Sequence, residues 1–433
     1  MSNKSILTPN TPSHNEEWIT SFDDPLSLLI YTERYVNKGA YHSYRHRSEV
    51  SRQFRPLDGD DEFDLPYVSL PKKAVNLYQT QDVPELNNII LDNKQVHFFI
   101  HPDMVDVYTE RGIGEFAKER ISGYVKACPT SSTRTLITSL DGKPYMIKVD
   151  LSGKKLGRLP RALTEVSAIQ SHYMSGEFIK ISKTDNLPAT FGYLPEPMSL
   201  GTSCLDSSFG NIFRLVNPSP TNQSGKYLMP VFSLYSPDFR NPGHTLIIKQ
   251  LVNFSGLSPE KFFEEKVARP MISNVLFIAF KYGILLEAHT QNTLIELDSD
   301  WQITRFIYRD LQAASVNPEY RKKIGLPADN PKESKIAGGR VPQNTIPIEY
   351  STFYDHRIGY HSLEEIIIAL ASLYPTQVNV LQRIVKRIFK EVMEELGVNP
   401  DSYFPPSSYY IFSDGDSTTG HLTVEEYPDP PYR

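Results

Sequence analysis

The sequence predicts an α+β protein in which antiparallel sheets are surrounded by helices. Two pairs of β-rich segments are each joined by a turn signal, which is typical of antiparallel hairpins. Apolar residues at helical spacing dominate the last third of the chain. With 433 residues, the chain is long enough for roughly two to four domains. We place the boundaries near residues 85 and 245, which gives domains 1–85, 86–245 and 246–433.

A first structured block contains one of the two hairpins. Val96–Ile100 is expected to form a short buried strand that leads into His101-Pro102. Thr135–Ser139 and Tyr145–Leu151 flank Asp141-Gly142, a dipeptide that favours a two-residue turn. This block is therefore expected to build an antiparallel sheet.

Helix signals begin after residue 257. Ser258 is a good N-cap, with Pro259 in the first turn. Apolar residues then recur at helical spacing as far as Gly283, which we expect to end the helix. Pro270 falls inside this pattern and predicts a kink or a break into two helices. Further on, Val378–Leu396 predicts a strongly amphipathic helix.

The second hairpin and another helix lie between these helices. Thr293–Leu297 and Trp301–Tyr308 are expected strands, joined by a turn at Asp298–Asp300. Ser362 and Glu365 have the spacing of a capping box, which predicts a helix start at Ser362.

Both ends of the chain are predicted to lack fixed structure. Residues 1–16 and the Pro-rich segment Tyr427–Arg433 have little apolar surface to offset the entropy of ordering. The polar start Met1–Ser13 has no apolar stretch behind basic residues, unlike a signal peptide.

Composition argues against several classes of function. The net charge of −6 disfavours general nucleic-acid binding, because such binding depends on neutralising phosphates. Apolar runs such as Val275–Phe280 are far shorter than the ~20 residues that cross a bilayer. The chain has two cysteines, Cys128 and Cys204, so we expect no disulfide framework and a cytoplasmic location.

A polar cluster surrounds the second predicted hairpin. Glu287, His289, Gln291 and Asn292 precede its first strand, and Asp310 follows its second strand. Since both positions lie opposite the turn, we expect Asn292 and Asp310 to come within reach of one another. Carboxylate and amide oxygens suit Mg²⁺, and His289 can donate a hydrogen bond to a carboxylate. The alternative is a polar strand end whose side chains cap backbone groups.

Hydroxyl and basic side chains gather around the first predicted hairpin. They are Ser132, Arg134, Thr135, Lys148, Arg158 and Arg161. Hydroxyl groups, a guanidinium fork and an ammonium group together suit the phosphates of a nucleotide. The alternative is a Ser/Thr turn beside a solvated basic face, since no P-loop or GxGxxG fingerprint is present.

Taken in order along the chain, these motifs resemble the NRPS-independent siderophore synthetases of the aerobactin-synthetase type. The motifs are His101-Pro102, Thr130–Thr135 (TSSTRT), Ile147-Lys148, Arg161, Gly283–Asn292 (GILLEAHTQN) and Arg309-Asp310. The likeness runs from about residue 96 to residue 310, and LEAHxQN with RD after a hairpin is its most specific part. The resemblance implies a cupped hand, with 1–85 as thumb, 86–245 as ATP-binding fingers and 246–433 as palm.

The resemblance also implies an activity. It implies an ATP-dependent acid–amine ligase that adenylates a citrate-like acid or a citrate derivative and condenses it with an amine or hydroxyl in siderophore-type biosynthesis. ATP and Mg²⁺ are the implied cofactors, and small molecules rather than nucleic acid or membrane are the partners. A homodimer is also expected.

The family's residue roles carry over to matching positions. The implied ATP-binding residues are Ser132, Arg134, Thr135, Lys148 and Gln291. Arg161 and His289 would hold the carboxylate that is activated. The implied Mg²⁺ residues are Asn292, Asp310 and Glu287.

The chain also departs from the family's pattern. It is shorter than typical members, and the early HPxHPxxKxR segment is absent. Asp103 replaces the tryptophan after HP, and Leu156-Gly157 stands where a threonine is expected. No C-terminal lysine with an MRL-like strand is found, since Thr418–Glu426 occupies that region. We therefore expect an acid other than free citrate, with Arg158 or the Lys332–Arg340 loop as a substitute source of charge.

Two other readings remain open. The first is a non-catalytic nucleotide-binding or regulatory protein of the same fold, which the missing lysine and threonine favour and the intact EAHTQN and RD oppose. The second is an ATP-dependent phosphotransferase, although the HRD and DFG motifs of protein kinases are absent.

Overall fold

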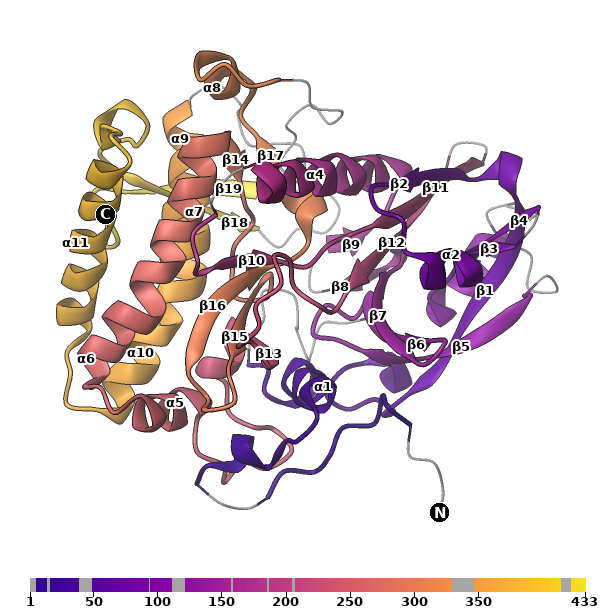
Figure 1. The fold of residues 1–433 in the computed structure, drawn as a ribbon, viewed down its shortest axis with the longest axis horizontal. Helices are drawn as coiled ribbons and strands as arrows, with labels where there is room; N and C mark the ends of the chain where they lie inside the picture. Colours follow the sequence, from indigo (N-terminus) through magenta and orange to yellow (C-terminus); the bar gives the residue numbers. More distant parts are fainter. Residues whose placement is uncertain are drawn as a thin grey trace. The chain divides into compact units, whose positions relative to one another are not determined.

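The chain divides into two compact units. The computed structural model describes residues 5–13, 16–38, 49–92, 94–110, 121–156, 159–184, 187–204, 207–328, 346–413 and 422–433. Unit 1 comprises Met1–Ser13, Ser21–Asn186 and Tyr193–Asn222. Unit 2 comprises His14–Thr20, Leu187–Gly192 and Gln223–Arg433. Both units combine antiparallel sheets with helices, which confirms the predicted α+β class (Figure 1).

Unit 1 is built on a nine-stranded sheet in the order β2-β11-β12-β7-β6-β5-β1-β4-β3. Its strands are β1 (Phe63–Pro71), β2 (Asn76–Gln79), β3 (Leu91–Asp92), β4 (Gln95–Phe99), β5 (Gly123–Pro129), β6 (Thr135–Leu140), β7 (Lys143–Lys148), β11 (Met198–Cys204) and β12 (Ser207–Leu215). Each strand runs antiparallel to its neighbours in the sheet. Strands from the first 85 residues thus share one sheet with strands from the segment that follows.

The predicted hairpin forms the middle of this sheet. Strands β6 and β7 pair from Thr135 opposite Lys148 to Leu140 opposite Lys143. Asp141 and Gly142 join them with φ values of 50° and 73°. A type I′ turn requires positive φ at both central residues, and Asp-Gly supplies them at low cost.

Helices complete unit 1. They are α1 (Pro25–Tyr35), α2 (Pro84–Ile90), α3 (Val105–Glu110) and α4 (Glu165–Thr184), and a short ribbon of β8 (Leu151–Leu156) and β9 (Leu159–Arg161) precedes α4. Helix α4 contacts β11 and β12 (Figure 1). A buried core of aromatic and branched aliphatic side chains fills the sheet from β1 to β12.

The start of the chain is ordered over its described residues, contrary to the prediction for residues 1–16. Leu7 is fully buried, and the Asn10 backbone N–H donates to the Ser27 hydroxyl of α1 at 2.7 Å. In unit 2, the Trp18 indole donates to the Thr245 carbonyl at 2.9 Å and stacks on His244. Leu7 therefore anchors a segment whose average composition is polar, and Trp18 anchors the residues that follow it.

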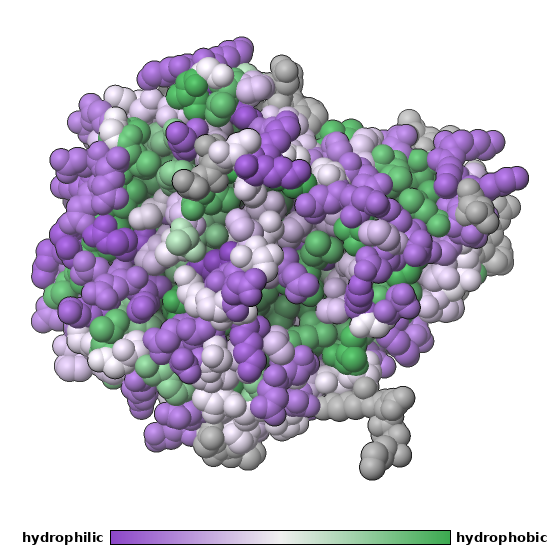
Figure 2. Space-filling view, viewed as in Figure 1, coloured by the Kyte–Doolittle hydropathy of each residue, from purple (hydrophilic) through white to green (hydrophobic). Residues whose placement is uncertain are grey.

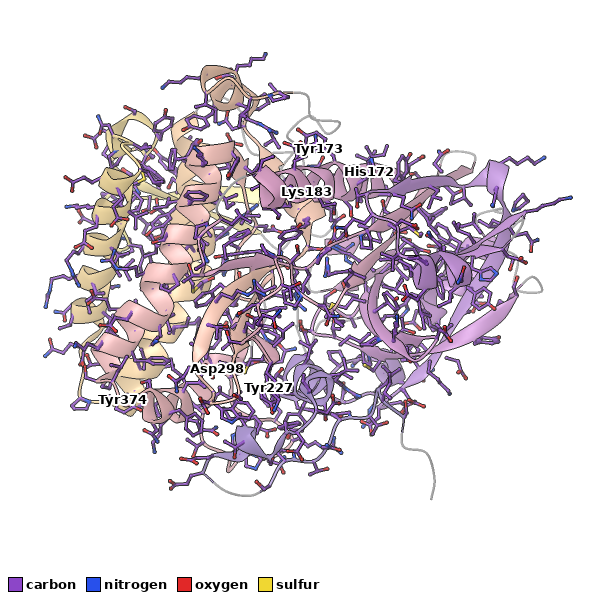
Figure 3. The ribbon with its side chains drawn as sticks, in the orientation of Figure 1. His172, Tyr173, Lys183, Tyr227, Asp298 and Tyr374 are labelled. Atoms are coloured by element: carbon purple, nitrogen blue, oxygen red, sulfur yellow. The ribbon has the colours of Figure 1, made fainter. Side chains whose placement is uncertain are left out.

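Unit 2 contains a four-stranded sheet in the order β10-β16-β15-β13. The strands are β10 (Phe191–Tyr193), which begins in this unit, β13 (Tyr227–Pro230), β15 (Thr293–Leu297) and β16 (Ile303–Tyr308). Strands β15 and β16 are the second predicted hairpin, and Tyr227 of β13 lies beside its turn near Asp298 (Figure 3).

Helices and short two-stranded ribbons make up the rest of unit 2. The α-helices are α5 (Ile247–Ser255), α6 (Pro259–Phe262), α7 (Arg269–Tyr282), α8 (Pro318–Lys323), α9 (Ile346–Ser351), α10 (Glu364–Leu373) and α11 (Val378–Glu395). The ribbons pair β14 (Ile284–Leu285) with β17 (Ser315–Val316) and β18 (Ser408–Ser413) with β19 (Leu422–Tyr427). Helix α11 contacts α7 and α10, and its outer face is largely hydrophilic (Figure 2).

The helix predicted after Ser258 changes type along its length. Ser258 accepts from the Lys261 N–H, and Gly283 ends the helix at φ 63°, both as predicted. A π-helical stretch, Phe263–Ala268, lies between α6 and α7 and ends just before Pro270. A wider turn before the proline takes the place of the predicted kink.

Two predictions for the last 80 residues are wrong. Ser362 does not start a helix, because it lies inside a π-helical segment, Thr352–Leu363, and its hydroxyl donates to the Ala288 and Arg357 carbonyls. Tyr427–Arg433 is not a loose tail, because Tyr432 is 1% exposed and Arg433 pairs with Asp355. Over the described ranges, no helix has the length and apolarity needed to cross a membrane.

Candidate functional site

The TSSTRT segment of unit 1 folds into a tight turn held by its own hydroxyl groups. Thr130 Oγ1 donates to the Thr135 carbonyl at 2.6 Å, and Ser132 Oγ lies 2.9 Å from Thr135 Oγ1. Thr133 has φ 64°, a left-handed conformation that non-glycine residues rarely adopt. Left-handed residues of this kind recur at functional sites, and the backbone N–H groups of Thr130–Thr135 donate within the protein, which fixes the shape of the turn.

Basic side chains flank this turn. Thr135 and Lys148 are directly opposite each other in the β6–β7 pair, and Lys148 is 3% exposed. Arg134 donates from one guanidinium nitrogen to the Ala162 carbonyl at 3.0 Å. The predicted phosphate-binding residues Ser132, Arg134, Thr135 and Lys148 are therefore brought together at one end of the hairpin.

A residue that sequence reasoning missed supports the turn from behind. Glu33 of α1 is fully buried, and its Oε2 accepts from the Ser131 backbone N–H at 3.1 Å. The two residues are 98 positions apart, so no local pattern links them. Glu33 fixes the position of the turn, because a buried carboxylate is costly unless it is hydrogen-bonded.

Asp150 organises the chain after Lys148. Its carboxylate accepts from the Leu163 N–H at 2.7 Å and from the Ser152 hydroxyl at 2.8 Å. The backbone of Arg161 pairs with Leu151 in the β8–β9 ribbon. The side chain of Arg161 and the whole of Arg158 lie outside the described parts of unit 1.

The His101 side chain is packed inside the protein and supports the end of a strand. It is fully buried, and its Nδ1 accepts from the Asp103 N–H at 3.2 Å. Asp103 in turn accepts from the Ser51 N–H and hydroxyl at 2.6 and 2.5 Å. Asp103, which replaces the family's tryptophan, therefore ties the strand end to the segment before β1.

In unit 2, the open end of the β15–β16 hairpin joins the EAHTQN and RD motifs. The Arg309 N–H donates to the Asn292 carbonyl at 2.9 Å, and Arg309 Nε donates to the Gln291 carbonyl at 2.9 Å. Asp310 comes next, with φ 68°. Arg309 thus fixes the backbone at Gln291 and Asn292, and Asp310 follows it in a left-handed conformation.

The EAHTQN segment is itself a compact turn. The His289 carbonyl accepts from the Asn292 N–H at 2.9 Å, and His289 Nδ1 accepts from the Gln291 N–H at 3.3 Å. A neutral imidazole whose Nδ1 accepts carries its proton on Nε2. His289 can therefore donate a hydrogen bond from Nε2 to a carboxylate oxygen.

Oxygen donors for a divalent cation lie at this turn. The Asn292 amide nitrogen donates to Glu287 Oε2 at 3.3 Å, which leaves the amide oxygen as the ligand atom. Among the residues that the structure describes, no group of three or more His, Cys, Asp or Glu side chains could hold a metal. Mg²⁺ takes one or two carboxylates and completes its shell with water and phosphates, so the oxygen atoms of Glu287 and Asn292 at this turn are of the kind that this ion prefers.

The π-helical segment Thr352–Leu363 adds side chains that the sequence did not predict. Arg357 lies 3.5 Å from Glu287 Oε1, and both side chains are mostly buried. Burial, helped by His361, Arg357 and His289, lowers the pKa of His356 to about 2. Burial, helped by His289 and Arg357, lowers the pKa of His361 to about 3. Two neutral imidazoles and one cation therefore face the EAHTQN turn.

Burial also shifts an acid close to Arg357. It raises the pKa of Glu349 to about 7, although the positive charge of Arg357 opposes the shift. Asn317 donates to Glu349 Oε2 at 3.2 Å. Glu349 therefore gains or loses its charge near neutral pH, close to Arg357 and to the Asn317 amide.

The predicted site residues fall into two sets. Ser132, Arg134, Thr135, Lys148 and the backbone of Arg161 belong to unit 1. Glu287, His289, Gln291, Asn292 and Asp310 belong to unit 2. Each set is assembled within its own unit.

Comparison with known proteins adds evidence on the fold. Residues 265–404 match a family model described as ferric iron reductase FhuF-like transporter. No curated protein matches the chain in sequence.

Solved structures match along nearly the whole chain. Petrobactin biosynthesis protein AsbB from Bacillus anthracis str. Sterne superposes with a TM-score of 0.72 at 16% identity, covering 94% of this chain and 75% of AsbB. ATP-bound aerobactin synthetase IucA from Klebsiella pneumoniae gives 0.67 at 15% identity, covering 92% and 76%. Aerobactin synthetase IucC from Klebsiella pneumoniae gives 0.66 at 15% identity, covering 95% and 76%. The chain therefore has the fold of siderophore synthetases of the aerobactin type, and the resemblance predicted from its motifs is confirmed in its fold.

Proposed function

We propose that this chain is an ATP-dependent acid–amine ligase of siderophore-type biosynthesis. It adenylates a citrate-like acid or citrate derivative and condenses it with an amine or hydroxyl. The observation that carries the proposal is the pair of preorganised turns on a synthetase fold. One turn offers hydroxyls with Lys148, and the other offers His289 with oxygen donors for Mg²⁺.

The residues of each turn take separate roles in this proposal. Ser132, Arg134, Thr135 and Lys148 bind the phosphates of ATP, and Gln291 lies along the nucleotide. Arg161 and His289 orient the acid's carboxylate, whose oxygen attacks the α-phosphorus and displaces pyrophosphate. An amine or hydroxyl then attacks the acyl carbon and displaces AMP. Catalysis rests on positioning and charge neutralisation.

Mg²⁺ would be held by Asn292 and Asp310, with Glu287 beside them. When bound, it supplies positive charge opposite the phosphates. ATP as cosubstrate favours the cytoplasm as the place of the reaction, and we propose a homodimer, which light scattering tests.

The acid is proposed to differ from free citrate. A tricarboxylate needs several cationic partners, because buried carboxylates without them are strongly disfavoured. Arg158 and the Lys332–Arg340 loop, expected as sources of charge, lie outside the described residues. Arg357 supplies a cation beside the EAHTQN turn, and we propose that it binds a second carboxylate of the acid.

Pyrophosphate release tests the proposal. The chain is incubated with ATP, Mg²⁺ and a pool of polyamines against free citrate, mono-amidated citrate and simple dicarboxylates at equal concentration. We expect pyrophosphate with an acid other than free citrate. A clearly highest kcat/KM with free citrate contradicts the choice of acid, while ATP binding without turnover by any acid supports a non-catalytic nucleotide-binding or regulatory protein.

Two other activities are less well supported. Release of ADP instead of pyrophosphate would indicate a phosphotransferase. The FhuF-like match over residues 265–404 names a ferric iron reductase, and reduction of ferric iron would indicate that activity instead.

A further inference from the structure

A buried ion pair fixes the middle of the π-helical segment Thr352–Leu363. Arg433 Nε donates to both carboxylate oxygens of Asp355, at 3.0 and 2.9 Å. The Asp355 side chain is fully buried, and that of Arg433 is 9% exposed. Ser351 donates its hydroxyl to the same carboxylate at 2.6 Å. The ion pair is therefore desolvated and surrounded by further hydrogen bonds, which makes its geometry demanding.

Tyr432, the residue before Arg433, contacts the same π-helical segment at two other positions. The Tyr354 hydroxyl donates to the Tyr432 carbonyl at 3.1 Å. The ring of Tyr432 lies so close to Gly359 that a Cβ there would approach it to 2.3 Å. Tyr432 thus packs directly on helical backbone, where only glycine leaves enough room.

These contacts bracket Arg357. Tyr354 and Asp355 precede it by three and two positions, and Gly359 follows it by two. Arg433 also donates to the Ser407 carbonyl at 2.7 Å, next to strand β18. The Tyr432-Arg433 pair, here called the clamp, therefore ties the turn of helix that carries Arg357 to the ribbon beside it.

A π-helix needs such support. Its wider turns are less stable than α-helical ones and occur mostly at functional sites. This segment extends over 12 residues, so external contacts must select it over the α-helix that the same residues could form. The clamp supplies those contacts where Arg357 reaches Glu287.

We propose that Arg433 is a positioning residue of the candidate site, which through Asp355 sets the place of Arg357 beside the EAHTQN turn. The effect on catalysis rests on the proposed function, because it assumes that Arg357 binds the acid. The effect on the π-helical segment does not depend on that function.

Substitution of Arg433 tests the proposal with kinetics. In Arg433→Ala, the KM for the acid should rise about tenfold or more while the KM for ATP stays unchanged, since a small displacement of a positioning group is costly. Arg433→Lys keeps the charge without the two-pronged geometry and should restore part of the loss. A merely structural role would lower kcat through a smaller folded fraction and leave both KM values alone, which would overturn the proposal.

The matched control is Arg269→Ala. Arg269 pairs with Glu391 between α7 and α11 in the same unit, away from the EAHTQN turn. This variant should keep both KM values. An equal rise in acid KM for Arg269→Ala and Arg433→Ala would show a general effect of lost ion pairs and would overturn the assignment.

Hydrogen exchange separates failure of this inference from failure of the proposed function. Residues 352–363 of full-length Arg433→Ala should exchange faster than in the wild type, with Arg433→Lys between them and strands β15 and β16 unchanged. If the wild type releases no pyrophosphate but the exchange result holds, the proposed function fails and the clamp stands. Unchanged exchange at residues 352–363 overturns the clamp, whatever the activity.

Discussion

Thr135 and Lys148 face each other across strands β6 and β7, at the end of the hairpin where the TSSTRT turn leads into β6. The register is set at the other end by Asp141-Gly142, because a two-residue turn fixes which residues pair. A hydroxyl and an ammonium group are thus held side by side on rigid backbone.

Removing Lys148 should weaken ATP binding. Lys148→Ala is expected to cost about 1.5–3 kcal/mol of binding free energy, the usual scale for a hydrogen bond to a charged group. Lys143→Ala, at the other end of the same strand, is the matched control and should bind ATP normally. Calorimetry that finds equal ATP affinity for Lys148→Ala and the wild type would remove Lys148 from the site.

Asp310→Asn should abolish most turnover without unfolding the protein. Asparagine tolerates the left-handed conformation of Asp310 as well as aspartate does, so the fold is retained. The lost charge weakens Mg²⁺ binding and the neutralisation of the phosphates. Asp298→Asn, at the turn of the same hairpin, should keep activity. Full activity of Asp310→Asn, or wild-type activity without divalent metal, would contradict the metal assignment.

Stability should fall as the pH drops below about 6.5. The pKa of His356 is lowered in the folded protein. Below about pH 6.5, the unfolded chain therefore binds a proton at His356 while the folded chain keeps this imidazole neutral. At pH 5.5 this single histidine should cost about 1.4 kcal/mol of unfolding free energy relative to high pH. His356→Gln should flatten the pH dependence by that amount between pH 7.5 and pH 5.5 in urea titrations. Parallel curves for both proteins would show that His356 is not kept neutral.

Leu7→Ala should destabilise unit 1 although it lies in a polar segment. Leu7 is fully buried, and such truncations cost about 2–5 kcal/mol in a packed core. Ile6→Ala is the neighbouring control, because Ile6 is 44% exposed and should cost little. A melting temperature for Leu7→Ala that matches that of Ile6→Ala would show that the segment does not pack on the body.

The sequence was informative where the physics is local. Asp141-Gly142 and Asp298–Asp300 predicted the two hairpins, because the conformation of a turn depends on only a few neighbouring residues. Ser258 and Gly283 marked helix ends for the same reason. The order of the motifs predicted the fold of the siderophore synthetases.

What the sequence could not show depends on distant partners. Glu33 meets Ser131 across 98 positions, and Arg433 meets Asp355 across 78. Ser362 has the spacing of a cap, but the preceding residues continue the helix and turn its hydroxyl toward carbonyls. The composition of Tyr427–Arg433 is typical of a solvated tail, yet Tyr432 is buried against Gly359. Composition averages over such single contacts.

The anchoring of Trp18 has a consequence for how the protein is made. Its indole is satisfied by Thr245, 227 residues later in the chain. At translation rates of about 5–20 residues per second, this residue waits roughly 10–45 seconds on the ribosome for its partner. During that interval a large aromatic side chain is presented to chaperones and to neighbouring nascent chains. The Glu33–Ser131 contact of unit 1 is translated before Thr245 and can form while Trp18 still waits, so a slower elongation rate should affect the soluble yield through Trp18 rather than through that turn.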